Sequence, residues 1–152
     1  MRHLLIVLSA LMLASPAGAK TLDYGSRAGM EVTIVKKTGI GSSHASIVTK
    51  HTRQNAIGFC RDYVGEVTEE CIAKELRTPL HLEITADCKT GKFTTFYGGK
   101  MLFQGRNKGT DVTTDYLITS IDDDNAVLDG SGASGYDYTL EQFKALCPNR
   151  VR

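Results

Sequence analysis

The sequence predicts an α+β fold: a curled antiparallel β-meander of five to seven strands, a disulfide-linked helical hairpin and a C-terminal helix. Three observations support this prediction. Several short segments alternate apolar and polar residues with a period of two, three segments have the helical period, and four cysteines are placed to link these elements. We expect residues 30–152 to form a single α+β domain.

The first nineteen residues have the pattern of a secretory signal peptide. A short basic start precedes an apolar run from Leu4 to Ala14, and small residues ending at Ala19 supply a cleavage site. A membrane-spanning helix needs roughly 20 apolar residues, so this run is too short to remain as an anchor. We expect export into an oxidising compartment. The polar residues 20–29 are expected to form a flexible N-terminal segment.

Two strands and two helices are expected in the first half of the domain. Residues 30–36 and 44–50 alternate apolar and polar side chains and could pair as a hairpin. Thr52 and Thr68 are typical N-caps, and they predict helices over residues 52–64 and 69–77. Gly65 separates these two helices, which gives a short helical hairpin.

The second half of the domain reads as the rest of the meander followed by one helix. The expected strands are residues 80–87, 93–97, 100–104, 113–121 and 126–129. Thr139 with Gln142 forms a capping-box pattern that predicts the start of the final helix, and Pro148 ends it.

Four cysteines allow three connectivities. The midpoint of Cys60 and Cys71 falls at the turn of the predicted helical hairpin, where residues at equal distances from the turn face each other. This placement favours a Cys60–Cys71 bridge and leaves Cys88 with Cys147. The rival interpretation is a zinc site, but the sequence has no C-x-x-C spacing and no histidine near a cysteine at ligand spacing. We therefore expect no metal and no cofactor.

Charge gives no reason to expect a nucleic acid or an anionic membrane as partner. Removal of residues 1–19 takes away only Arg2, so 17 basic residues remain against 17 acidic residues. The acidic group Asp122, Asp123, Asp124 and Asp129 does not fit the ligand spacing of an EF-hand loop. It is interpreted as a solvated hairpin tip, with weak calcium binding left open.

A catalytic alternative depends on the histidines. His44 follows two serines, and it could combine with Asp62 or Asp87 in a hydrolase triad; His81 is the other candidate base. The sequence contains no G-x-S-x-G nucleophile elbow to support such a triad. The simpler interpretation is that these histidines lie at the surface.

A loop rich in glycine, serine and tyrosine precedes the final helix and is the candidate binding loop. Its candidate residues are Ser131, Ser134, Gly135, Tyr136 and Tyr138. Tyrosine offers a large contact surface at low entropic cost, as it does in the binding loops of antibodies. In the alternative interpretation, Tyr136 or Tyr138 packs beneath the final helix and serves the fold.

Two resemblances follow from these residues. The segment from Ser134 and Gly135 to Tyr138 is similar to the S-G-x-x-Y motif of the periplasmic C-type lysozyme inhibitors, whose serine loop plugs the lysozyme cleft. That family's second motif, a tyrosine followed by Thr-Lys-Gly, is missing here. The resemblance implies an inhibitory role for Ser134 and Tyr138.

Most of the chain resembles small uncharacterised exported proteins of Gram-negative bacteria. The similar segments are Phe59-Cys60, Cys71, residues 88–91, 97–105, 133–136 and 145–148. This resemblance implies a periplasmic location and a four-cysteine architecture, with no reaction attached. We therefore expect a non-enzymatic periplasmic binding or envelope-accessory protein whose partner is an envelope protein or glycan. A small histidine-dependent hydrolase and a lysozyme-inhibitor-like protein are the alternatives.

Overall fold

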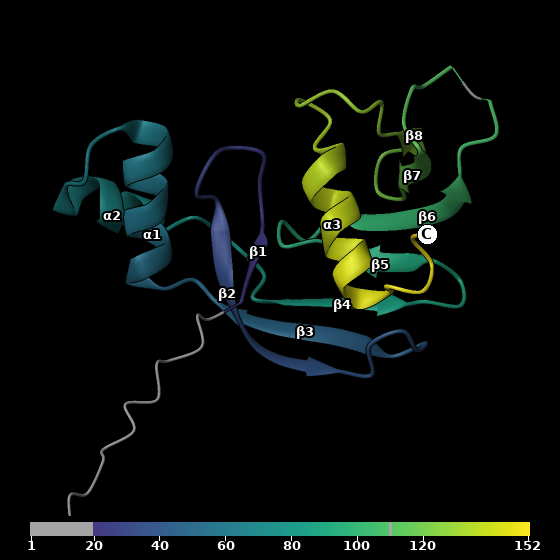
Figure 1. Ribbon diagram of the computed structural model, residues 1–152, viewed down its shortest axis with the longest axis horizontal. Helices are drawn as coiled ribbons and strands as arrows, with labels where there is room; N and C mark the ends of the chain where they lie inside the picture. Colours follow the sequence, from purple (N-terminus) through teal and green to yellow (C-terminus); the bar gives the residue numbers. More distant parts are fainter. Residues whose placement is uncertain (1–19, 110) are drawn as a thin grey trace, which may run out of the picture.

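The computed structural model describes residues 20–109 and 111–152, and its central feature is an antiparallel sheet of eight strands (Figure 1). Each strand pairs with the next strand along the chain, which confirms the expected meander. The strands are β1 (Thr21–Asp23), β2 (Glu31–Thr38), β3 (Ala45–Lys50), β4 (Glu83–Asp87), β5 (Lys92–Thr94), β6 (Lys100–Arg106), β7 (Tyr116–Ser120) and β8 (Ala126–Val127). The predicted signal peptide, residues 1–19, lies outside the described residues.

The count of eight strands corrects the expected five to seven. The additional strand is β1, which comes from the segment 20–29 that the sequence predicts to be flexible. Thr21 pairs with Thr33 of β2, and the Tyr24 side chain directly after β1 is 0% exposed. A three-residue strand is too short to show alternation, and the burial of Tyr24 depends on contacts with residues far along the chain.

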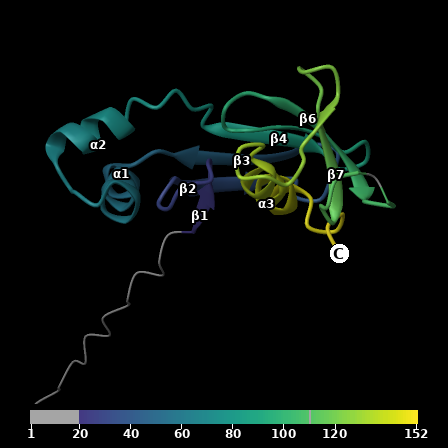
Figure 2. The ribbon, with the colours of Figure 1, turned by 90° about the horizontal axis from the view of Figure 1, so that it is seen from above.

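The sheet curls around helix α3 (Tyr136–Leu146), which covers one of its faces (Figure 2). Phe143 of α3 is fully buried, with its ring centroid 4.3 Å from that of Phe103 and 4.9 Å from that of Phe93. Leu146 is also fully buried in this cluster. Each such side chain stabilises the fold by about 1.5–3 kcal/mol through loss of contact with water. We call the sheet together with α3 the sheet body.

Polar and covalent contacts fix α3 on the sheet. The expected Cys88–Cys147 disulfide is present and joins the end of β4 to the end of α3, with a Cα–Cα distance of 5.5 Å. The fully buried Gln142 amide donates to the Asp23 carbonyl oxygen at 2.9 Å and accepts from the Phe96 backbone N–H at 3.3 Å. One side chain of α3 thereby satisfies backbone groups at β1 and after β5.

The start of α3 differs from the expected capping box. The helix begins at Tyr136, its N-cap is Gly135 in the left-handed conformation, and Thr139 lies inside the helix, where it is buried. Because Gln142 is bonded to Asp23 and Phe96, its side chain does not return to cap the helix. Thr139 and Gln142 therefore match the sequence pattern of a helix cap, but both side chains are buried in the core.

The helical hairpin lies beside the β1–β2 end of the sheet, away from β7 and β8 (Figure 1). It consists of α1 (Arg53–Phe59), a π-helical turn η1 (Cys60–Val64) and α2 (Glu69–Glu75). Thr52 accepts a hydrogen bond from the Asn55 N–H and Thr68 accepts one from the Cys71 N–H, so both predicted N-caps are confirmed. The expected Cys60–Cys71 disulfide closes the hairpin, with a Cα–Cα distance of 6.1 Å.

Candidate functional site

A pocket of about 560 Å³ lies where the helical hairpin meets the β1–β2 connection, and we call it the junction pocket. Its lining is contributed by Arg27, Met30, Phe59, Tyr63, Val64, Thr68, Glu70, Cys71, Lys74, Glu75, Arg77 and Thr78. Pockets that bind small molecules commonly have volumes of roughly 300–1,000 Å³ and combine apolar walls with a few polar groups. The junction pocket has this size and this composition.

A close backbone contact sets the position of the hairpin against the β1–β2 connection. Gly29 has a φ of +76°, and a Cβ atom at this position would lie 2.7 Å from backbone atoms of Gly58 and Phe59. A side chain at residue 29 would therefore push α1 away from the sheet. Nearby, the Thr33 hydroxyl of β2 donates to the Asn55 side-chain oxygen of α1 at 3.1 Å. These contacts hold one wall of the pocket.

The apolar wall of the junction pocket is formed by aromatic side chains of α1 and η1. The rings of Phe59 and Tyr63 are stacked with centroids 5.4 Å apart, and Tyr63 is 48% exposed. The Arg27 guanidinium lies 4.8 Å from the centre of the Tyr63 ring, a cation–π contact. Val64 next to Tyr63 is also exposed. This wall offers aromatic surface that the fold does not cover.

The rim of the junction pocket carries more positive than negative charge. Arg27, Lys74 and Arg77 contribute cations, whereas Glu70 and Glu75 contribute carboxyl groups. Within residues 20–109 and 111–152, none of the three cations forms an ion pair with a carboxylate. Glu75 is buried, so its carboxyl group contributes to the floor of the pocket rather than to its rim.

A buried polar cluster of Tyr24, His51 and Glu75 lies behind the junction pocket. The Tyr24 hydroxyl donates a hydrogen bond to Oε1 of Glu75, and Nε2 of His51 lies 3.6 Å from the same oxygen. The Tyr24 and His51 rings meet edge to face at 5.5 Å. The three residues come from the end of β1, the end of β3 and the end of α2, so the cluster joins the hairpin to the sheet body.

Burial disfavours charge on His51 and on Glu75. It lowers the pKa of His51 and raises the pKa of Glu75. Both ring nitrogens of His51 are buried without a hydrogen-bond partner in the part of the chain that the structure describes. Buried polar groups are nearly always paired, and shifted pKa values gather at functional sites. The cluster is therefore part of the candidate site.

Sequence reasoning missed this cluster because its members are far apart in the chain and share no motif. One signal was available: Glu75 lies three residues after Ile72, on the buried side of α2, where an acidic residue is unusual. The position of His51 between β3 and the Thr52 cap indicates nothing about Glu75. Their proximity follows from tertiary packing.

The predicted binding loop before α3 is ordered by its own hydrogen bonds. The Ser131 N–H donates to the Asp129 carboxylate at 2.9 Å, and the Ser134 hydroxyl donates to the Ser131 carbonyl oxygen at 2.8 Å. Hydrogen bonds from Ser131 lower the pKa of Asp129. Ser131 is exposed and Ser134 is partly exposed, so both residues remain accessible to a partner.

The tyrosines of this loop face the protein. Tyr136 is 6% exposed, and its hydroxyl oxygen accepts a hydrogen bond from the Tyr116 N–H at 3.1 Å. Tyr138 is half-buried, and its hydroxyl lies against Gly135, at 2.4 Å from where a Cβ atom would stand. Tyr136 therefore serves the core, in agreement with the alternative interpretation of the sequence.

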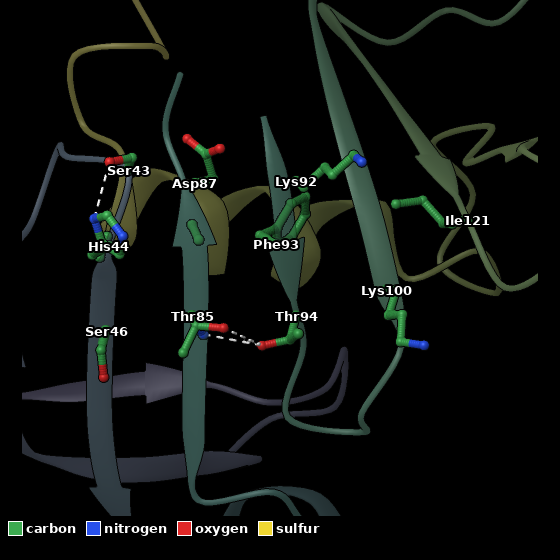
Figure 3. A pocket seen from close by; sticks show the side chains of 12 residues that line it. Ser43, His44, Ser46, Thr85, Asp87, Lys92, Phe93, Thr94, Lys100 and Ile121 are labelled. Carbon is green, nitrogen blue, oxygen red and sulfur yellow. Dashed lines mark hydrogen bonds between the residues drawn. The ribbon is translucent and has the colours of Figure 1, made fainter. Parts of the chain in front are cut away.

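The histidines predicted for a hydrolase lie elsewhere. A second pocket of about 510 Å³ lies on the sheet face opposite α3, with His44 and Asp87 at the ends of neighbouring strands (Figure 3). Ser43 Oγ lies 3.0 Å from Nδ1 of His44, and both residues are at the surface. Among the described residues, no hydrogen bond or ion pair joins His44 or His81 to a carboxylate.

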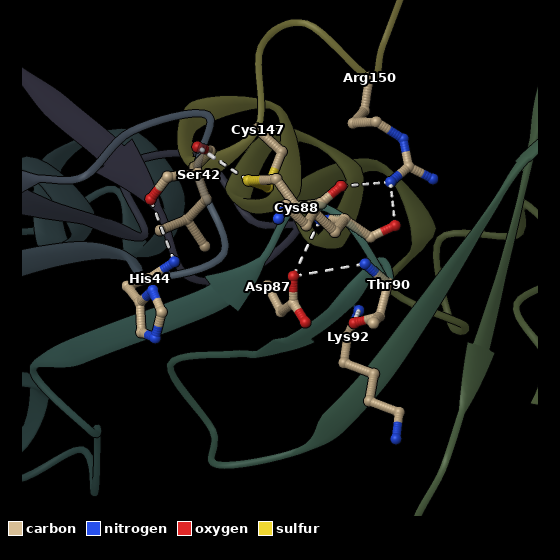
Figure 4. Close-up of a disulfide and its surroundings, with 10 residues drawn as sticks. Ser42, His44, Asp87, Cys88, Thr90, Lys92, Cys147 and Arg150 are labelled. Atoms are coloured by element: carbon tan, nitrogen blue, oxygen red, sulfur yellow. Dashed lines mark hydrogen bonds between the residues drawn. A yellow bond between two sulfur atoms is a disulfide. The ribbon is translucent and has the colours of Figure 1, made fainter.

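The two acidic candidates of the triad have other partners. The Asp87 carboxylate accepts backbone hydrogen bonds from Lys89 at 2.9 Å and Thr90 at 3.4 Å, next to the Cys88–Cys147 bridge (Figure 4). Hydrogen bonding by the Thr90 hydroxyl lowers the pKa of Asp87. Asp62 forms an ion pair with Arg61. Asp87 therefore stabilises its turn, and the described residues do not place the side chains of the alternative triad together.

The described residues contain neither a metal-binding cluster nor a membrane-spanning helix. No group of three or more histidine, cysteine, aspartate or glutamate side chains within residues 20–109 and 111–152 could hold a metal ion. In the same residues, no helix has the length and apolar character needed to cross a membrane. Comparison with known proteins found no matching family model, no similar curated protein and no similar solved structure.

Proposed function

We propose that this is an exported, non-enzymatic binding protein of the bacterial envelope and that it binds its partner at the junction pocket. One observation carries the proposal: a pocket of about 560 Å³ has an exposed aromatic wall, held in place by a disulfide-closed hairpin. Holding exposed aromatic groups in one geometry before binding reduces the entropic cost of association. The candidate loop residues Ser131 and Ser134 lie on another part of the fold and form a secondary proposal for contact with an envelope protein or glycan.

Export to the periplasm is the second part of the proposal. It is supported by the signal-like pattern of residues 1–19 and by two disulfides that use all four cysteines. Disulfides of this kind persist in oxidising compartments. Intact mass after secretion and alkylation should show a chain that begins at Lys20 and has no free thiol. An unprocessed chain with alkylated cysteines would contradict export.

The binding proposal can be tested with an uncharged aromatic probe, N-phenyl-1-naphthylamine, whose fluorescence rises in apolar surroundings. The chain contains no tryptophan, so the probe signal is free of indole emission. We expect saturable binding with one site per chain, and at least tenfold weaker binding in the Tyr63→Ala variant, which lacks the central ring of the wall.

A matched pair of variants controls for general surface hydrophobicity. Val64 lies in the junction pocket and Val127 lies on β8, and the two side chains are exposed to a similar degree, 51% and 45%. Val64→Ala should weaken probe binding and Val127→Ala should leave it unchanged. Equal binding by the wild type, Tyr63→Ala and Val64→Ala would contradict a binding role for the junction pocket.

A further inference from the structure

We infer that the junction pocket selects small amphiphilic anions: molecules with one apolar ring system or chain and a single anionic head group. The inference rests on the proposed function and specifies the chemistry of its ligand. The apolar body would lie against Phe59 and Tyr63, and the head group would lie toward Lys74 and Arg77. The ligand is a free small molecule, because the pocket volume is that of a small-molecule site.

Charge complementarity is the first argument. Arg27, Lys74 and Arg77 face the pocket without an ion pair among the described residues, whereas neighbouring cations of the hairpin are neutralised. Arg53 is paired with Glu69, and Arg61 is paired with Asp62. Arg27, Lys74 and Arg77 thus line the pocket without an ion pair, and an anion bound there would displace no carboxylate from them.

The placement of the acidic residues is the second argument. Of the two carboxyl groups at the pocket, the buried one is Glu75, which accepts a hydrogen bond from Tyr24. Burial raises the pKa of Glu75 and so favours its neutral form. At the exposed rim, the single carboxylate of Glu70 therefore stands against three cations, Arg27, Lys74 and Arg77. The resulting field at the rim is positive and favours an anionic head group over a neutral or cationic one.

The position of Arg27 is the third argument. Its guanidinium lies over the Tyr63 ring at 4.8 Å, so a cationic group borders the aromatic wall directly. A ligand whose anionic group is attached next to its apolar body could contact the ring and the guanidinium at the same time. A ligand with a cationic head group would meet Arg27, Lys74 and Arg77 with like charge.

Two probes that share the same rings test the inference. 8-Anilinonaphthalene-1-sulfonate is N-phenyl-1-naphthylamine with one added sulfonate, so the ratio of their dissociation constants isolates the contribution of the negative charge. We expect the anionic probe to bind at least tenfold more tightly than the neutral probe at low ionic strength. Raising the salt concentration should reduce that advantage, because rim charges are screened by salt.

Charge-removing variants locate the effect. Lys74→Gln should weaken binding of the anionic probe about fivefold, and the double variant Lys74→Gln/Arg77→Gln should weaken it more than tenfold. The affinity for the neutral probe should change less than twofold in both variants. Lys92→Gln is the matched control, because Lys92 is an exposed lysine that lines the other pocket, on the sheet face opposite α3. It should leave both probes unaffected. Circular dichroism of each variant confirms that it is folded.

The outcomes separate this inference from the proposed function. If both probes bind with equal affinity and both lose affinity in Tyr63→Ala, the pocket binds apolar ligands and the inference on anions is wrong. If neither probe binds, the proposed function is wrong as well. If Lys92→Gln weakens the anionic probe as strongly as Lys74→Gln does, the charge effect belongs to the other pocket and the inference is overturned.

Discussion

The sheet body and the helical hairpin are stabilised in different ways. The sheet body buries a continuous cluster of apolar side chains between the curled sheet and α3, including the stacked rings of Phe103 and Phe143. The hairpin has a small cluster of its own, made of Ala56, Cys60 and Ile72, and it is attached to the sheet by polar contacts. A cluster of this size buries too little apolar area to hold two short helices.

This difference explains where the candidate site lies. The hairpin leaves Tyr63, Val64, Val67 and Leu76 exposed, and it borders the sheet body through the junction pocket. Regions with few buried apolar contacts open at lower free energy than the main core. The protein therefore combines a stable framework with a disulfide-closed element whose surface is available for binding.

Phe143→Ala should have the largest effect, because the ring is fully buried between Phe93 and Phe103. We expect a loss of about 3–5 kcal/mol in the free energy of unfolding, measured by urea denaturation. Phe59→Ala in the hairpin removes the same atoms from a half-buried site, so it should reduce the free energy of unfolding clearly less than Phe143→Ala does. An equal loss at the two positions would show that the hairpin is as well packed as the sheet body.

The two disulfides should differ in the region that they protect. Cys88 and Cys147 are 59 residues apart, and the chain-entropy model assigns their bridge about 4 kcal/mol; Cys60 and Cys71 are 11 apart, which gives about 3 kcal/mol. Replacing Cys88 and Cys147 by alanine should lower the stability of the whole protein. Replacing Cys60 and Cys71 should open the hairpin locally, and this opening would be detected as increased susceptibility to proteolysis near residues 60–68. Cleavage spread over the strands in the latter variant would contradict local opening.

Tyr24→Phe should loosen the hairpin. The substitution removes the hydroxyl that donates to Glu75, leaves a buried carboxyl oxygen without that donor and costs about 1–3 kcal/mol. Tyr97→Phe is a matched control: the Tyr97 ring lies 6.1 Å from that of Tyr24, and no hydrogen bond of its hydroxyl occurs within the described residues. Thermal unfolding compares the two. Similar losses of thermal stability in both variants would show that the Tyr24–Glu75 hydrogen bond does not stabilise the hairpin.

The smallest effect is a dependence of stability on pH through His51. Burial lowers its pKa in the folded state, so below the unfolded-state value of about 6.5 the unfolded chain binds more protons. The stability linked to His51 is present above that pH and is lost as the pH falls through the lower pKa of the folded state. Glu75 acts in the opposite direction: burial raises its pKa, so its contribution is lost as the pH rises.

His51→Gln isolates the histidine contribution. Between pH 7.5 and pH 5, the free energy of unfolding of the wild type should fall more than that of the variant, because only the wild type carries the buried imidazole. Denaturant titrations at several pH values measure the difference. Parallel pH profiles for the two proteins would show that His51 has the same pKa in the folded and unfolded states.

Local signals in the sequence predicted most of the fold. Period-two alternation located the strands from β2 onward, and Thr52 and Thr68 located the starts of α1 and α2. Cys60 and Cys71 lie at equal distances on either side of the hairpin turn, and this placement indicated their pairing. Each of these signals acts over a few neighbouring residues. They are therefore visible without knowledge of the tertiary structure.

The features that sequence reasoning missed depend on distant contacts. β1 is defined by pairing with β2 and by the burial of Tyr24, and the start of α3 is altered because Gln142 bonds to residues near β1 and β5. The candidate site follows the same rule. Its cluster unites Tyr24, His51 and Glu75, and no local pattern connects those positions.

Hydrogen exchange with and without 8-anilinonaphthalene-1-sulfonate tests whether the junction pocket, beside the less stable hairpin, is the binding site. We expect that, before the probe is added, the hairpin exchanges faster than β3, β4 and α3. We also expect the probe to slow exchange in residues 53–76 and in the 24–30 connection, while exchange in the sheet is unchanged. Protection confined to the sheet face around His44, or to the loop 129–135, would contradict the assignment of the binding site to the junction pocket.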